Sequence, residues 1–314
     1  MEKATVAILL ATYNGEKYLR PLLDSLFAQT EQDWQLIVSD DGSRDSTRAI
    51  LREYAERYPQ KLRILEHAQP TGSSKDNFLY LTRHAGEYEY VMYCDQDDVW
   101  KPDKISHTLQ TMRGTEAADR GVPCLVHTDL AVVDADLRPL KDSFIASSFL
   151  DPKRDRLCQL VIQNVVTGCT VMINHALWEL AMLPADPAKI VMHDMWLALL
   201  AAARGRIGFL PEATILYRQH GNNVVGAKDV RSLGYIATFA GRLKQNSASL
   251  RRCEAQAGEL RRVLGDSLTE EQRNTLEEYA HIRQKNKIAR WGVLARRRIW
   301  LLGGRRKLAE IILI

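Results

Sequence analysis

Three apolar runs in the first hundred residues each end directly in polar side chains, and this repeated pattern constrains the fold more than any other feature. The runs are TVAILLA at 5–11, WQLIVS at 34–39 and YVMYC at 90–94. Such runs, separated by apolar residues at helical spacing, predict an α/β fold in which helices cover a mostly parallel sheet. The polar clusters are Thr12-Tyr13-Asn14, Asp40-Asp41 and Asp95-Gln96-Asp97-Asp98. Because parallel strands present their carboxyl ends at one edge of a sheet, we expect the three clusters to meet in one crevice.

The same periodicities predict the remaining elements. Further strands are expected at 62–65, 124–133, 206–210 and 213–217, and helices at 16–29, 44–58, 76–84, from Lys101 onward, and at about 194–203, 230–264 and 270–302. Residues 137–155 are rich in Pro, Ser and Asp, which predicts a loop over the site. We therefore expect a catalytic domain over residues 1–225 and a helical C-terminal region over residues 226–314.

The acidic cluster after the third apolar run offers oxygen ligands for a hard cation. Asp95 and Asp97 are candidate ligands of Mg²⁺ or Mn²⁺, because one or two carboxylates suffice when substrate phosphates complete the coordination shell. The alternative interpretation is a solvated acidic turn in which Asp98 caps the helix that follows. Convergence of the three clusters on one edge favours the metal site.

Several classes of protein are excluded or disfavoured. No GxGxxG follows the first strand and no GxxxxGK[ST] occurs, so neither a dinucleotide fingerprint nor a P-loop is present. Five dispersed cysteines without a CxxC pair indicate a reducing compartment and argue against structural zinc. The amino terminus leads straight into a strand without a signal peptide, which predicts a cytoplasmic protein. The uncharged stretch 158–178 is interrupted by polar residues and is expected to be buried interior.

Six fragments in order along the chain carry a family resemblance. They are VAILLATYNGEKYL, LIVSDDGSRDST, MYCDQDDVWKPDK, TGCTVMIN, HDMWLALLA and LYRQHGNN. Over about the first 225 residues the chain resembles the family-2 inverting glycosyltransferases, which have a GT-A nucleotide-sugar-binding fold. Within that family, DQDDVW, HDMW and YRQHGNN are most similar to the bacterial rhamnosyltransferases.

The resemblance implies roles for individual residues. Asp194 falls where the family places its catalytic base, although the commoner Glu-Asp pair is His193-Asp194 here. In the alternative interpretation, Asp194 has no catalytic role and only caps the start of its helix. The implied metal ligands are Asp97, Asp95 and His220. The implied substrate-binding residues are Thr12, Tyr13, Asn14, Asp40, Asp41, Asp95, Gln96 and Arg218, with Asp40 accepting a pyrimidine imide N–H and Asp95 contacting the ribose or a metal-bound water.

These roles imply transfer of a sugar from a nucleoside-diphosphate donor to a saccharide or lipid-linked acceptor in bacterial surface polysaccharide synthesis. A divalent metal is the implied cofactor, and dTDP-rhamnose is one candidate donor. Two alternatives stay open: a sugar nucleotidyltransferase, and a nucleotide-sugar-binding scaffold without catalysis. The former usually carries a Gly-rich loop after its first strand, where this chain has ATYNGEK.

The last 34 residues carry most of the positive charge. They hold ten Lys or Arg and one acid, a charge of +9, so the chain total of +4 leaves −5 for residues 1–280. Basic residues beside Trp291 and Trp300 favour a helix on an anionic membrane surface, which would make the protein peripheral on the inner face of the cell membrane. The alternative is a helix that packs on the catalytic domain or forms a homo-oligomer. Nothing in the first 280 residues supports nucleic-acid binding.

Overall fold

A nine-stranded mixed sheet forms the framework of the computed structural model, which describes residues 4–67, 69–220, 239–303 and 313–314. The strand order is β3-β2-β1-β4-β8-β6-β9-β5, and β7 pairs with β6. The strands are β1 (Val6–Thr12), β2 (Trp34–Asp40), β3 (Leu62–Leu65), β4 (Tyr90–Asp95), β5 (Val99–Trp100), β6 (Cys124–Val133), β7 (Pro139–Lys141), β8 (Met172–Asn174) and β9 (Arg206–Arg218). The predicted α/β class with a mostly parallel sheet is confirmed.

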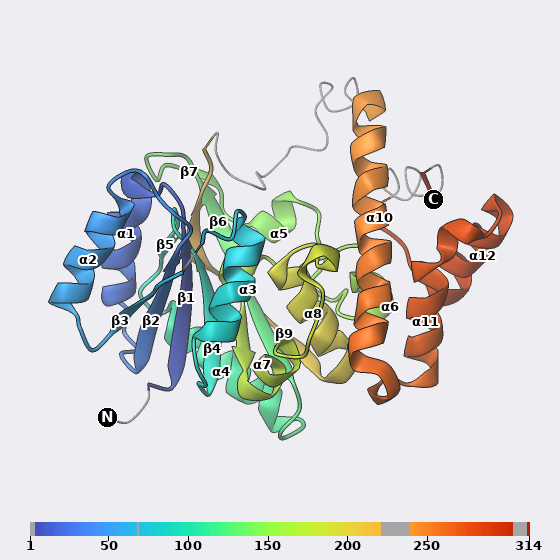
Figure 1. The fold of residues 1–314 in the computed structure, drawn as a ribbon, viewed down its shortest axis with the longest axis horizontal. Coiled ribbons are helices and arrows are strands. Elements are labelled where there is room, and N and C mark those ends of the chain that lie inside the picture. Colours follow the sequence, from blue (N-terminus) through green and yellow to red (C-terminus); the bar gives the residue numbers. More distant parts are fainter. Residues whose placement is uncertain (1–3, 68, 221–238, 304–312) are drawn as a thin grey trace. The chain divides into compact units, whose positions relative to one another are not determined.

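The helices over the first four strands follow the predicted alternation. They are α1 (Glu16–Phe27), α2 (Thr47–Arg57) and α3 (Ser74–His84). Strands β1 to β4 run parallel, and the winding direction reverses between β3 and β4. Because crossovers are right-handed, this reversal brings α3 to the opposite sheet face from α1 and α2, as Figure 1 shows. The carboxyl ends of β1 and β4 are therefore a topological switch point, where open α/β sheets bind ligands.

The core of the sheet consists of buried apolar residues. Every residue from Val6 to Leu10 and from Val91 to Cys94 is fully buried, as a strand covered on both faces requires. The stretch 158–178, predicted to be interior, is largely buried and contains α6 (Leu157–Leu160), the short turn η1 (Gly168–Thr170) and the beginning of α7 (His175–Ala181). That prediction is confirmed.

The chain divides into two compact units, and neither is a single stretch of sequence. The first unit comprises residues 1–144, 166–182 and 206–226 and contains the whole sheet, together with α4 (Lys104–Ala117). The second comprises residues 145–165, 183–205 and 227–314. The predicted domain boundary at residue 225 lies outside the described residues and stays a prediction.

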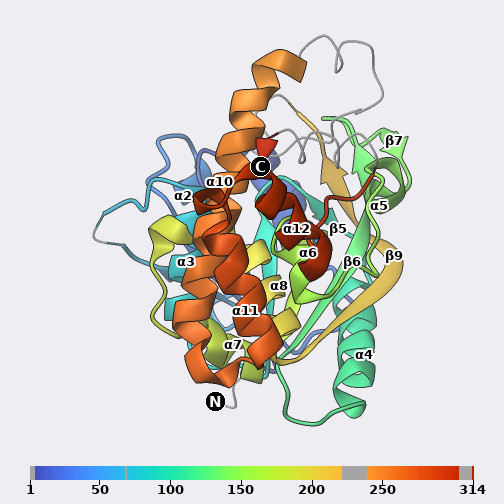
Figure 2. The same cartoon turned by 90° about the vertical axis from the view of Figure 1, so that its right-hand side faces the viewer.

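The second unit is helical. Its elements are α5 (Phe144–Ser147, of which Phe144 belongs to the first unit), α6, η2 (Pro187–Lys189), α8 (His193–Arg204), α10 (Phe239–Leu264), η3 (Gly265–Ser267), α11 (Glu270–Ala280), η4 (Ile282–Gln284) and α12 (Lys287–Arg297). Figure 2 shows α10 and α11 side by side as a helical hairpin. The predicted helix at 194–203 is confirmed as α8.

Two predicted elements are wrong. Residues 137–155 were expected to form a loop, yet they contain β7 and α5, because β7 pairs with the end of β6 across a tight turn at Asp134. The single helix expected over 270–302 is split into α11 and α12. A buried Ile282 marks the break, and the side chain of Asn286 accepts a hydrogen bond from the Ala289 amide and so caps a new helix.

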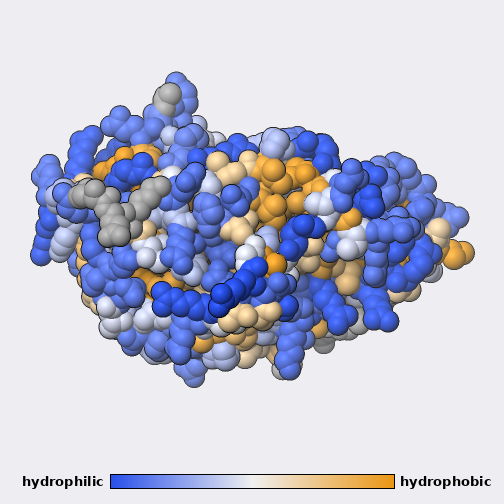
Figure 3. Space-filling view, turned by 90° about the horizontal axis from the view of Figure 1, so that it is seen from below, coloured by the Kyte–Doolittle hydropathy of each residue, from blue (hydrophilic) through white to orange (hydrophobic). Residues whose placement is uncertain are grey.

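The described helices include none that is long and apolar enough to cross a membrane. Figure 3 shows one face of the molecule, on which hydrophilic residues predominate and hydrophobic residues gather in smaller areas between them.

Candidate functional site

The three polar clusters meet at the carboxyl edge of the first unit's sheet. In the strand register, Thr12 at the end of β1 pairs with Asp40 at the end of β2, and Ala11 pairs with Asp95 at the end of β4. The predicted convergence is therefore confirmed. Segments that are 28 and 83 residues apart in the sequence contact each other there.

Asp40 is held by a dense set of donors. Thr12 Oγ1 donates to its Oδ2 at 2.9 Å, Ser43 donates from both its amide and its hydroxyl, and Arg48 Nε lies 3.1 Å from Oδ1. Only 6% of Asp40 is exposed. The carboxylate is thus held by four donors of the protein itself, and its predicted contact with a pyrimidine imide stays a prediction.

The neighbouring Asp41 contacts a different segment. Its carboxylate accepts hydrogen bonds from the Thr71 amide and hydroxyl and from the Gly72 amide. Gly72 has a φ of +84°, a conformation that favours glycine. Asp41 therefore holds the loop between β3 and α3, and its predicted contact with substrate stays a prediction.

Gln96 fixes the backbone of the first cluster. Its amide accepts from the Tyr13 N–H and donates to the Tyr13 carbonyl, both at 2.9 Å. A Cβ on Gly15 would lie 2.3 Å from Gln96 Oε1, so a larger residue there would displace the Gln96 amide from Tyr13. Asn14 adopts a left-handed conformation (φ 47°), and its side chain accepts from the Arg44 amide. The outcome is a rigid loop that leaves 55% of Tyr13 exposed, available to pack against a planar ligand.

Three further predicted site residues, Asp97, Arg218 and His220, also lie close together. His220 Nε2 lies 2.8 Å from Asp97 Oδ2, and its ring stacks on Tyr18 with centroids 5.0 Å apart. Arg218 is buried, lies over the same Tyr18 ring, and donates from Nε to the Asp97 carbonyl at 2.9 Å. The end of β9 is thereby bound to the turn after β4.

The Asp97–His220 pair fits a divalent cation. A hard ion with bonds of about 2.1 Å places adjacent ligand atoms roughly 3 Å apart, and the two atoms here are 2.8 Å apart. Both side chains keep partial exposure, 18% for Asp97 and 14% for His220, which leaves room for further oxygen ligands. These residues therefore suit Mg²⁺ or Mn²⁺, with substrate or water filling the other positions.

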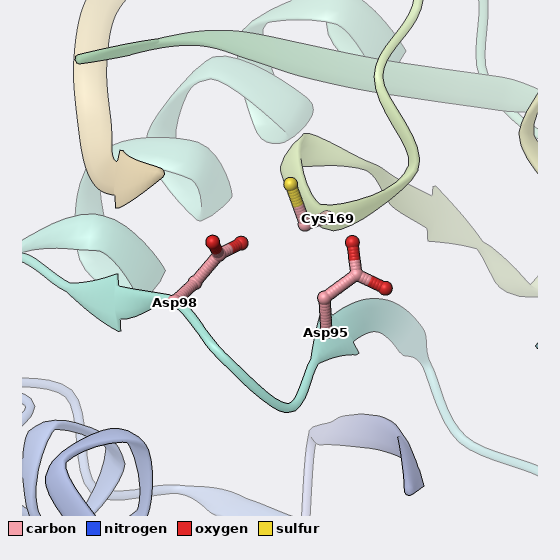
Figure 4. Close-up of side chains that lie close together, drawn as sticks. All are labelled: Asp95, Asp98 and Cys169. Atoms are coloured by element: carbon pink, nitrogen blue, oxygen red, sulfur yellow. The ribbon is translucent and has the colours of Figure 1, made fainter. Parts of the chain in front are cut away.

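Asp95 lies with a different pair of residues, Asp98 and Cys169 (Figure 4). Their ligand atoms lie within 4.8 Å of one another. Burial, followed by the charges of Asp97 and Asp95, raises the pKa of Asp98 well above its usual range, and burial likewise raises the pKa of the Cys169 thiol. A cysteine sulfur is a poor ligand for a hard cation, so this cluster fits the metal less well than Asp97 and His220 do.

The structural role of Asp98 in the site was not predicted from the sequence. The alternative of an exposed turn with Asp98 as a helix cap is wrong, because Asp98 is fully buried at the start of β5 and the residue that precedes α4 is Asp103. Its Oδ1 accepts the Arg218 amide at 3.3 Å. Lys104 is buried in the same region, where burial lowers its pKa to about 8. The sequence feature that could have indicated the burial of Asp98 is the strand-forming pair Val99-Trp100 directly after the acidic residues.

Asp194 belongs to the second unit. It lies in the first turn of α8 and accepts a hydrogen bond from the Met195 amide at 2.6 Å. The residue in the N-cap position is Met192, so Asp194 is not the N-cap residue of α8. Burial lowers the pKa of the preceding His193 to about 3, which keeps that ring neutral. The assignment of Asp194 as the base rests on its place in HDMW.

The comparison with protein families decides the identity of this arrangement. The family model described as glycosyl transferase family 2 matches residues 7–180, more than half of the chain. This protein belongs to glycosyl transferase family 2. Four of the six fragments overlap this part of the chain, whereas HDMWLALLA and LYRQHGNN lie beyond the matched residues.

Three individual proteins illustrate the relationship. The chain is 29% identical over 226 residues to dTDP-rhamnosyl transferase RfbG of Shigella flexneri, covering 69% of this chain and 74% of the relative. It is 30% identical over 173 residues to a putative teichuronic acid biosynthesis glycosyltransferase, TuaG of Bacillus subtilis, covering 55% of this chain and 63% of the relative. The structure of mannosyltransferase PcManGT from Pyrobaculum calidifontis, in complex with GDP-Man and Mn²⁺, aligns over 100% of this chain and 79% of its own, with a TM-score of 0.54 and 17% identity. This last likeness confirms the GT-A fold.

Proposed function

We propose that this family-2 member is a metal-dependent inverting glycosyltransferase. It moves a sugar from a nucleoside-diphosphate donor to a saccharide or lipid-linked acceptor in bacterial surface polysaccharide synthesis. The relationship to RfbG, whose name specifies a dTDP-rhamnosyl transferase, makes dTDP-rhamnose the first donor to test. The relationship to TuaG supports the polysaccharide pathway.

One observation carries the proposal most directly: the 2.8 Å approach of His220 to Asp97 at the carboxyl edge of the sheet. The two residues are 123 positions apart in the sequence, and each is held by separate contacts. An exposed acidic turn would not need a histidine positioned against one of its carboxylates. A divalent ion bound together with a diphosphate can use a carboxylate and an imidazole as adjacent ligands.

Each of these residues would have a separate role in a single in-line displacement. Asp97 and His220 would hold the ion, which when bound neutralises charge on the leaving diphosphate. Asp40 and the exposed ring of Tyr13 would orient the nucleobase. Asp194 would take the proton of the acceptor hydroxyl while its oxygen bonds to the anomeric carbon and the bond from that carbon to the diphosphate breaks. The electron pair of the broken bond leaves with the nucleoside diphosphate, and the anomeric configuration inverts.

A donor screen tests this function. The full chain is incubated with Mn²⁺ and dTDP-, UDP- and GDP-sugars together with lipid-linked saccharide acceptors, and the released phosphate species is identified. We expect release of a nucleoside diphosphate from one donor class and an acceptor product of inverted configuration. Release of pyrophosphate would identify a nucleotidyltransferase, and binding of nucleotide sugars without turnover would identify a scaffold. Either result would contradict the proposal.

We further propose that α12 binds an anionic membrane surface next to a lipid-linked acceptor. Ile288 is 78% and Trp291 39% exposed, one helical turn apart, and Lys285 and Lys287 beside them are exposed. The opposite face packs inward through Val293 and Leu294.

The arginines of α12 have other partners. Arg296 and Arg297 pair with Glu278, and Arg290 donates to backbone carbonyls, so these three arginines stabilise the fold. Arg305, Arg306 and Lys307 lie outside the described residues.

Reversing the charge of the two exposed lysines tests the membrane proposal. The double variant Lys285→Glu and Lys287→Glu is expected to bind vesicles of phosphatidylglycerol and phosphatidylcholine at least ~30-fold more weakly, because each cation contributes about 1 kcal/mol at an anionic surface. The matched control reverses Arg251 and Arg252, which are exposed on α10. Cosedimentation is the measurement, and equal binding by both double variants would contradict a role for this face of α12.

A further inference from the structure

Two polar residues of α10 are buried more completely than their chemistry favours. Gln256 is 0% and Glu259 1% exposed, although glutamine and glutamate are rarely buried fully. In the described part of the chain, Gln256 Nε2 has no hydrogen-bond partner, so its oxygen carries the polar contact. Both face the segment 184–191, which lies in the same unit, and η2 within that segment packs on α10. The two side chains accept backbone amides that a hydrophobic pair would leave unpaired, so the polar pair fixes the path of this segment.

The contacts tie the backbone of this segment at three places. Gln256 Oε1 accepts the Val191 amide at 2.7 Å, and Glu259 Oε1 accepts the Asp186 amide at 2.7 Å. Arg262 donates to the Pro184 carbonyl at 2.6 Å and to both carboxylate oxygens of Glu259. Arg262 lowers the pKa of Glu259 to about 2, so this carboxylate stays ionised at any assay pH. The segment is therefore anchored mainly through its backbone, and one of its own side chains, Lys189, adds an ion pair to Glu259 at 3.3 Å.

The anchored segment leads directly into the helix that carries Asp194. Val191 precedes Met192, whose extended backbone (φ −158°, ψ 151°) occupies the N-cap position of α8. Asp194 follows in the first helical turn. The path of the chain into the first turn determines where the carboxylate of Asp194 lies. The anchor at Val191 is three residues from that carboxylate.

We propose that Gln256, supported by Glu259, is a positioning residue for the catalytic base Asp194. This inference rests on the proposed function, and it gives α10 a role in the chemistry. A general base works only when it lies within hydrogen-bond reach of the proton it removes, and a displacement of about 1 Å can cost on the order of a hundredfold in rate. Gln256 limits such displacement by holding the residue that leads into the helix.

The test compares Gln256→Met with a neighbouring control on the same helix. Methionine keeps the length and volume of glutamine but cannot accept the Val191 amide well. We expect kcat to fall ~10- to 100-fold while the KM for donor and the affinity for dTDP or UDP with Mn²⁺ stay within twofold of wild type. Gln256→Glu retains an acceptor oxygen and should recover part of the lost kcat.

The control is Arg261→Ala, which removes an ion pair from α10 to Glu277 of α11 but no contact with the anchored segment. Its kcat should stay at the wild-type value. Rates are normalised to the nucleotide-binding stoichiometry from calorimetry, so that unfolded protein does not count. An unchanged kcat in Gln256→Met, or an equal loss in Arg261→Ala, would overturn the inference.

The two proposals can fail separately. If Asp194→Asn abolishes turnover and Gln256→Met does not change it, the base assignment survives and only the positioning role is refuted. If Asp194→Asn is fully active, the base assignment itself is refuted, and the positioning role is refuted with it.

Discussion

Replacing Asp194 with asparagine is expected to lower turnover by roughly two to four orders of magnitude, the usual contribution of a positioned general base. Asparagine keeps the size of the side chain and its ability to accept from the Met195 amide, so α8 should begin as it does in the wild type. Donor affinity should stay close to the wild-type value, because the base acts on the acceptor hydroxyl. The measurement is kcat for sugar transfer alongside calorimetry with dTDP or UDP.

Asp266→Asn is the matched control for that variant. Asp266 is an exposed carboxylate of the same unit and pairs only weakly with Arg273 at 3.3 Å. Losing its charge should leave kcat unchanged. Wild-type turnover in Asp194→Asn would mean that another group accepts the proton, and Asp194 would then be only a first-turn helix residue.

The second large effect is expected at Asp97. Its replacement by alanine should weaken binding of Mn²⁺ and of the nucleoside diphosphate together, each by at least ~10- to 100-fold, since even partners outside the coordination shell cost that much in metal sites. Metal and nucleotide binding are coupled because each compensates the charge of the other. Asp95→Ala should have a smaller effect on both affinities, because Asp95 lies with Asp98 and Cys169 and not with His220.

Calorimetry with and without EDTA separates the possible outcomes. Wild-type protein in EDTA should bind dTDP or UDP as weakly as Asp97→Ala does with Mn²⁺ present. Asp136→Asn, at an exposed position in the turn after β6, controls for the loss of one negative charge. Nucleotide affinity that is insensitive to both EDTA and Asp97→Ala would refute the metal role.

The strands and the convergence of the clusters were predictable because they depend on local pattern. An apolar run such as Val6 to Leu10 is typical of a strand that is buried on both faces of a sheet. Parallel strands place their carboxyl ends at the same edge of the sheet, whatever their side chains are. Helix α8 was predictable for the same reason, since its apolar residues repeat with helical spacing.

Individual side-chain directions inside a polar cluster were not predictable. Val99-Trp100 indicates a strand directly after residues 95–98, but it does not single out Asp98 as the residue that turns fully inward, because its partner, the Arg218 amide, lies 120 positions away. The roles of Gln256 and Glu259 were hidden likewise, since their partners are backbone amides of a distant segment. Such contacts depend on tertiary placement, which periodicity does not encode.

The interleaved threading of the chain has a consequence for protein engineering. Residues 145–165 and 183–205 leave the sheet-bearing unit and join the helical one, after which the chain returns each time to the sheet. A truncation near residue 225 would therefore not yield an intact minimal enzyme, because it would leave α8 and the segment anchored by Gln256 without the helices that cover them. Exchange of C-terminal helices between relatives must for the same reason carry these two internal segments along, as a discontinuous module of three pieces.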